Sequence, residues 1–99
     1  MISSTKLYQI CEEGERRYKT DPQTPPGFKD AKNKDGVRKY SDLIMWKEIL
    51  RYAREKSVNV IFVTDDVKSD WWIDDNGQRE FHPYLCQEFQ RETQMQIVA

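Results

Sequence analysis

One run of residues limits the possible folds of this chain more than any other. Four consecutive apolar residues, Val60-Ile61-Phe62-Val63, lead through Thr64 into two adjacent carboxylates, Asp65 and Asp66. Three of the four are β-branched and neither Gly nor Pro interrupts them, which predicts a strand. A strand that is apolar on both faces is typical of a parallel sheet that is covered on both faces. The run therefore predicts an α/β domain.

The two carboxylates follow the strand at the edge where α/β domains bind ligands, beyond the carboxyl ends of the strands. Adjacent carboxylates repel each other and are costly to desolvate unless a cation or a hydrogen-bond donor compensates them. A divalent-metal site at Asp65 and Asp66 is one interpretation of this stretch. A solvated turn is the other, and the stretch alone does not separate the two.

Helical periodicity predicts three helices, over residues 4–19, 41–56 and 83–91. Ser4 or Thr5 can cap the first helix, Ser41 can cap the second, and Pro83 suits the first position of the third. Asp42 complements the positive end of the second helix, and that position also lets its side chain point along the carboxyl edge of the sheet. On position alone, helix-end electrostatics is the simpler explanation of Asp42.

Short strands complete the predicted fold. Asn76-Gly77 is the strongest hairpin signal in the chain, with arms expected near residues 71–73 and 79–81. Residues 94–99 predict a last strand, parallel to the strand at residues 60–63 and joined to it by a helical crossover. Because two strands do not make a stable open sheet, we expect either a partner that supplies further strands or, as the favoured alternative, a larger parent domain.

Residues 20–40 form a predicted loop that is rich in Pro and Gly and carries more positive than negative charge. Its basic residues are Lys29, Lys32, Lys34, Arg38 and Lys39. These charges suit a nucleic-acid backbone, and a flexible solvated loop is the alternative. The adjacent Trp71 and Trp72 could stack on bases. Filling a gap between a loop and the core is the favoured interpretation of the two tryptophans.

Composition limits the function classes. A formal net charge of −1 over 99 residues gives no overall attraction to nucleic acid, so such binding requires a local basic patch. No apolar run approaches the length of a membrane span, and no secretion signal opens the chain. Cys11 and Cys86 match no metal-ligand spacing, so we expect reduced thiols in a cytoplasmic protein, with Cys86 in the core. His82, without a nearby second His, is weak evidence for a ligand or a base.

Four stretches together resemble the C-terminal portion of a bacterial PIN-like nuclease domain, and the resemblance runs from about Glu12 to the end of the chain. They are residues 25–30 (PPGFKD), 40–47 (YSDLIMWK), 60–66 (VIFVTDD) and 70–72 (DWW). The chain departs from the family at Ser41, where Gly is usual, and around His82, where a basic residue followed by Pro is usual. It also lacks the first strand of the family, which ends in a metal-binding Asp.

The resemblance implies an incomplete Rossmann-like three-layer α/β sandwich, with few parallel strands flanked by helices and the N-terminal strand missing. It implies binding of Mg²⁺ or Mn²⁺ and hydrolysis of phosphodiesters, usually in single-stranded RNA, with DNA possible. By motif, Asp42 and Asp65 are the clearest metal and catalytic residues, Asp66 is an auxiliary one, and Asp30 is a weaker metal ligand. We expect residues 1–99 to be one PIN-like domain, a C-terminal fragment of a larger one, with weak or no activity by itself.

Two other functions are open to this sequence. A catalytically silent module could bind nucleic acid or protein through the lysine-rich loop and the tryptophans, with its sheet completed by a partner or by self-association. An ATPase with residues 60–66 as a Walker-B-like strand is disfavoured, because the chain contains no GxxxxGK[ST] loop.

Overall fold

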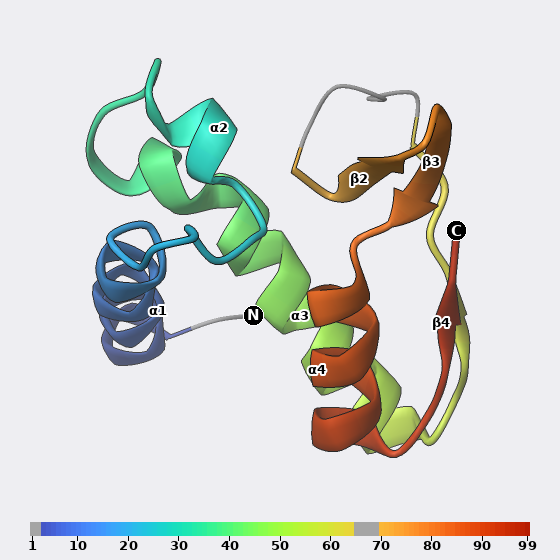
Figure 1. Cartoon of the computed structure of the whole chain (residues 1–99). Helices are drawn as coiled ribbons and strands as arrows, with labels where there is room; N and C mark the ends of the chain where they lie inside the picture. The colour runs from blue at the N-terminus through green and yellow to red at the C-terminus, as the bar shows by residue number, and fades with distance from the viewer. Residues whose placement is uncertain (1–2, 65–69) are drawn as a thin grey trace.

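The computed structural model describes residues 3–64 and 70–99, apart from the side chains of Asp30 and Asp75. Its elements are α1 (Ser4–Arg17), α2 (Phe28–Ala31), the 3-10 helix η1 (Gly36–Tyr40), α3 (Ser41–Lys56), β1 (Val60–Ile61), β2 (Trp72–Asp75), β3 (Gln78–Phe81), α4 (Pro83–Thr93) and β4 (Ile97–Val98). Figure 1 shows α3 running through the middle of the molecule, with α1 on one side and α4 and the strands on the other.

The three predicted helices form, with different caps. Ser3, and not Ser4 or Thr5, caps α1, because its side chain accepts a hydrogen bond from the Lys6 amide at 3.2 Å. Ser41 does not cap α3, because η1 runs directly into α3 and the N-cap position falls on Tyr40, whose side chain makes no capping bond. The His82 side chain caps α4, where it accepts from the Tyr84 amide.

The strands confirm the predicted connections. β1 and β4 are parallel, with Val60 opposite Ile97, and the last strand is shorter than the predicted residues 94–99. The β2–β3 hairpin turns at Asn76-Gly77, where both residues have positive φ values of 53° and 82°. Positive φ at both central residues is what this kind of tight hairpin requires, and Asn-Gly adopts it readily.

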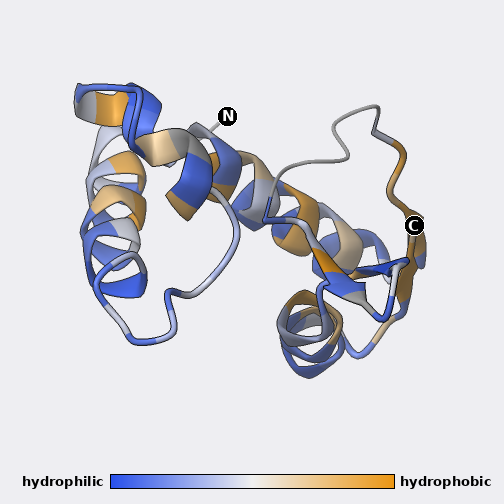
Figure 2. Ribbon diagram, turned by 45° about the horizontal axis from the view of Figure 1, so that its top comes forward, coloured by the Kyte–Doolittle hydropathy of each residue, from blue (hydrophilic) through white to orange (hydrophobic). Residues whose placement is uncertain are grey.

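The prediction that the strand around β1 is covered on both faces is wrong for the described residues. Val60 and Phe62 pack against the core, but Ile61 is 74% exposed and Val63 is 86% exposed. We call this exposed side the bare face of β1. Figure 2 shows hydrophobic ribbon near the C-terminus. The molecule is therefore an incomplete α/β fold, in which helices cover one face of a small parallel pair of strands.

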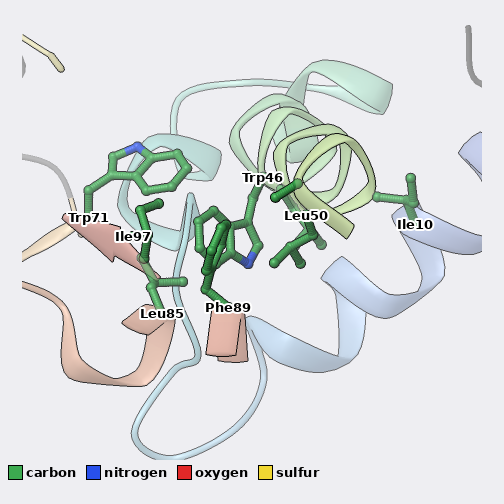
Figure 3. Packing of buried hydrophobic residues seen from close by; sticks show 9 residues of the cluster. Ile10, Trp46, Leu50, Trp71, Leu85, Phe89 and Ile97 are labelled. Carbon is green, nitrogen blue, oxygen red and sulfur yellow. The ribbon is translucent and has the colours of Figure 1, made fainter. Parts of the chain in front are cut away.

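The core is aromatic and lies between α3, α4 and the strands. Trp46 is fully buried, and its ring meets Trp71 edge-on with 5.8 Å between centroids and Phe89 at 6.1 Å. Figure 3 shows that Ile10 reaches this cluster from α1, on the far side of Leu50. Cys86 is only half-buried, so its predicted place in the core is wrong.

Residues 20–40 are more ordered than a loop prediction implies. They contain α2 and η1, and Tyr40 at the end of η1 is buried. The Tyr40 ring stacks on Tyr18 with 5.7 Å between centroids, and its hydroxyl donates to a carboxylate oxygen of Glu15 at 2.6 Å. These contacts attach the segment to α1. The next residue, Ser41, begins α3.

Candidate functional site

A buried carboxylate organises the end of the molecule where α3 begins. Asp70, just before β2, is 3% exposed. Its Oδ1 accepts the Gly27 amide at 2.7 Å, and its Oδ2 accepts the Lys29 amide at 2.9 Å. Both carboxylate oxygens therefore hold the segment that precedes and begins α2. Hydrogen bonds to a charged acceptor are stronger than those between neutral groups.

Asp42 lies against the same segment. Gly27 has a φ of +100°, and a Cβ atom on it would lie 3.0 Å from the Cβ of Asp42 and still closer to the Tyr18 hydroxyl. A side chain at position 27 would be strained by its backbone and would also collide with its neighbours. Glycine therefore allows the loop to approach the first turn of α3, and we call the meeting of Tyr18, Gly27, Asp42 and Asp70 the Gly27 junction.

Tyr18 lies near both carboxylates of the junction. Its hydroxyl donates to the Pro26 carbonyl at 2.7 Å. Burial raises the pKa of Tyr18, and the negative charges of Asp70 and Asp42 raise it further, because each disfavours a phenolate nearby. Two carboxylates therefore contribute negative charge at the junction, and the charge of Arg17 acts on the pKa of Tyr18 in the opposite direction.

His82 lies at the margin of the junction. Burial lowers its pKa, and the charge of Asp70 acts in the opposite direction. Its ring caps α4, as described above, which gives it a structural role.

A second set of buried charges ties the helices together. Arg17 of α1 forms a bidentate ion pair with Glu88 of α4, with N···O distances of 2.9 and 3.0 Å. The Trp46 indole donates at 2.9 Å to Oε1 of Glu88, which also accepts from Arg17 Nη2. Arg17 also donates to the Pro25 carbonyl. Burial alone would raise the pKa of Glu88, but Arg17 and then Trp46 bring it below its ordinary value. This carboxylate is therefore neutralised within the fold.

The predicted metal ligands can be placed only in part. Asp42 is half-buried at the junction, in the first turn of α3. Asp65, Asp66 and the side chain of Asp30 lie outside the described residues. Within the described ranges, no three His, Cys, Asp or Glu side chains gather in a way that could hold a metal ion.

The donor chemistry of the junction suits a hard divalent cation, because Mg²⁺ and Mn²⁺ take oxygen ligands. Both oxygens of Asp70 already accept backbone amides, and Asp42 is the second carboxylate of the junction. These two carboxylates alone do not make a metal site within the described ranges.

The predicted nucleic-acid contacts divide into two groups. The side chains of Lys29, Lys32 and Arg38 are exposed, and Lys34 and Lys39 are half-buried. Lys34 Nζ lies 3.5 Å from the Ser41 hydroxyl, which places a cation next to the residue that precedes Asp42.

Trp71 must be removed from the predicted contacts. It is 3% exposed and packs on Phe62 with 4.7 Å between ring centroids, so no base can reach its faces. The gap-filling interpretation is therefore right for Trp71. Trp72 is half-buried against Phe81, and its role toward a base stays a prediction.

Sequence reasoning missed the part that Asp70 plays at the junction. Asp70 falls within one of the stretches that carry the family resemblance, and the only local signal was its place before two tryptophans. Gly27 lies in another of those stretches and was otherwise placed only in a loop rich in Pro and Gly. Their hydrogen bond joins residues 43 positions apart, which no local pattern encodes.

Comparisons with known proteins give one match. A family model described as "PIN like domain" matches residues 1–85. This match begins before the Glu12 that we set as the start of the resemblance, and it ends within α4. No curated protein and no solved structure matches the chain. None of the described helices is long and apolar enough to cross a membrane.

Proposed function

The chain belongs to the PIN-like domain family, and from this premise we propose that it serves metal-dependent hydrolysis of phosphodiesters in single-stranded RNA. One observation carries the proposal. Asp42 lies at the start of α3, against a loop that the buried Asp70 holds in place. Two carboxylates at the carboxyl edge of an α/β fold favour a cation there.

Asp42 would hold Mg²⁺ or Mn²⁺ together with Asp65 and Asp66, and Asp30 is a further candidate ligand. When bound, such an ion lowers the pKa of a ligated water and offsets negative charge on the phosphate. The residues of the chain supply the rest. Asp70 and Gly27 hold the loop beside the first turn of α3, where Asp42 lies.

The basic side chains beside the junction support a phosphate-bearing substrate. Lys34 lies next to Ser41, and Lys29 follows the loop that Asp70 holds. A polyanion approaching Asp42 therefore meets positive charge at the border of a negative site. The positive charge beside the junction attracts the phosphate backbone. The carboxylates repel the phosphates from the position that the cation would occupy.

Thermal unfolding with and without Mn²⁺ tests the proposal. An ion that binds only the folded chain stabilises it by about 2.7 kcal/mol at a hundredfold excess over its dissociation constant. We expect this stabilisation in the wild type and its loss in Asp42→Asn and in Asp65→Asn. Asp21→Asn is the matched control, since Asp21 is an exposed carboxylate in the loop after α1. An equal response of Asp42→Asn and the control would refute the proposed metal site.

A second candidate function follows from the bare face of β1. Ile61, Val63 and Val98 expose aliphatic side chains that a parallel sheet normally covers. This observation favours a catalytically silent module whose sheet a partner completes. That function predicts no response to Mn²⁺ in any variant, together with a concentration-dependent mass that Val63→Lys abolishes.

A further inference from the structure

An open groove separates α1 from η1 on the side of the molecule that carries the basic segment. Its walls include Leu7, Tyr8 and Cys11 of α1 and Val37, Lys39 and Tyr40 of η1. The groove has a volume of about 570 Å³, which falls in the range of sites that bind small organic molecules. The metal site proposed above does not use any of these residues.

The groove presents an aromatic ring to solvent. Tyr8 is 67% exposed, and Val37 on the opposite wall is 52% exposed. An exposed tyrosine on a rigid helix can hold a planar ligand at small entropic cost, because only two side-chain torsions must be fixed. Trp71 cannot serve in this way, since it is part of the core.

The charges around the groove favour a ligand with a phosphate. Lys39 is the charged residue among those that line it, and its ammonium lies 5.8 Å from the centre of the Tyr40 ring. Glu15 accepts the Tyr40 hydroxyl and pairs with Lys19 at 2.7 Å, and its charge also interacts with that of Lys39. Arg38 is exposed on η1 beside Lys39 and adds a further positive charge.

The groove and the Gly27 junction are connected through packed aromatic rings. Tyr40 forms part of the groove wall and stacks on Tyr18, whose hydroxyl lies at the junction. Because η1 leads into α3 without an intervening residue, Tyr40 is two positions from Asp42. An extended ligand such as a single nucleic-acid strand, bound at the groove, can therefore continue over η1 toward Asp42.

We propose that this groove is a base-binding subsite for single-stranded RNA, in which one base stacks on Tyr8 and the adjoining phosphate pairs with Lys39. The choice of RNA rests on the proposed function, whereas the base-plus-phosphate chemistry rests on the groove. Aromatic stacking accepts any base, so the subsite provides affinity and register without sequence specificity. Double-stranded RNA hides its base faces and does not fit it.

Fluorescence anisotropy with a labelled oligouridine in EDTA tests the subsite without metal or catalysis. We expect Tyr8→Ala to weaken binding about tenfold, as the loss of one base stack does, and Tyr8→Phe to retain it. Tyr52→Ala is the matched control, because Tyr52 is an exposed tyrosine on α3 outside the groove. All of these side chains are exposed, and circular dichroism verifies that the variants fold.

The phosphate contact has its own readout. Lys39→Gln should make the negative slope of log affinity against log salt shallower by about 0.7, the value for one phosphate contact on a single strand. Lys56→Gln, at the far end of α3, should leave the slope unchanged. Equal binding of wild type and Tyr8→Ala, or equal affinity for duplex RNA, overturns the subsite. Binding in EDTA that depends on Tyr8, with no response to Mn²⁺, would support the subsite while refuting the metal site.

Discussion

Two buried carboxylates in this molecule are satisfied in different ways. Glu88 is 4% exposed and faces the Arg17 guanidinium, so its charge is cancelled by an equal charge in the interior. Asp70 is 3% exposed and accepts two backbone amides, which are neutral donors. Amides satisfy hydrogen bonding without removing the charge, and Asp42 adds a second carboxylate nearby.

The difference separates a structural carboxylate from carboxylates that are suited to a ligand. Arg17 pairs with Glu88 and also with Glu13 at 2.9 Å, so the charge of Glu88 is satisfied within the fold and α1 is joined to α4. The Gly27 junction brings two carboxylates together, and the backbone amides that Asp70 accepts carry no charge, which favours an added cation there. Each prediction below changes one of these carboxylates and so tests this division.

Removing the charge of Glu88 should have the largest effect. Glu88→Gln leaves the buried Arg17 guanidinium with the partly exposed Glu13, 2.9 Å away, as its remaining counterion, which should lower the free energy of unfolding by about 3 kcal/mol, the low end for breaking a buried ion pair. Urea denaturation at pH 7 measures the change. Glu92→Gln on the same helix is the control, because its partner Arg91 is exposed and such pairs contribute little. A loss below 1 kcal/mol would mean that the pair is not the structural element described here.

Acid should weaken the same pair, with a smaller effect. Burial alone would raise the pKa of Glu88, but Arg17 and Trp46 lower it below 4.5. A lowered folded-state pKa adds stability that is complete above about pH 4.5 and is lost as the pH falls through the folded value. We expect the urea concentration at the unfolding midpoint to decrease as the pH is lowered below 4.5. The decrease should be less steep in Glu88→Gln than in the wild type. Parallel pH profiles would contradict this assignment.

Asp70→Asn should have an intermediate effect. The amide of Asn retains one acceptor oxygen and turns an N–H donor toward a backbone amide, so one of the two hydrogen bonds is lost. We expect a loss of about 1.5–3 kcal/mol, as for a hydrogen bond to a charged group. Hydrogen exchange should accelerate at the Gly27 and Lys29 amides more than at amides of α4. Uniform acceleration across the chain would show instead that Asp70 supports the whole fold.

Local patterns predicted the elements on which these carboxylates lie. The bounds of α3 were predicted at residues 41 and 56 from its apolar periodicity, although Ser41 does not make the capping bond on which the predicted start was based. The parallel pairing of β1 with β4 followed from the crossover rule, and the hairpin followed from Asn76-Gly77. These features depend on neighbours in the sequence or on general topology.

The pairings that define the two sites could not be predicted in this way. Arg17 and Glu88 lie 71 positions apart, and both have the appearance of charges on solvated helical faces. Asp42 was selected because it begins a helix, and its contact with Gly27 depends on how Asp70 draws the loop inward. Exposed Ile61 and Val63 were expected to be buried, because a sequence records that a residue is apolar but not what covers it.

Asp42→Asn should have the smallest effect on the metal-free chain. The substitution removes a favourable interaction with the positive end of α3, worth about 0.3–1 kcal/mol, and also relieves repulsion with Asp70. Because the two changes oppose each other, we expect the free energy of unfolding in EDTA to change by less than about 0.5 kcal/mol. Urea denaturation beside Glu88→Gln measures it. A loss as large as that of Glu88→Gln would place Asp42 among the structural carboxylates, and the difference between the two regions would no longer hold.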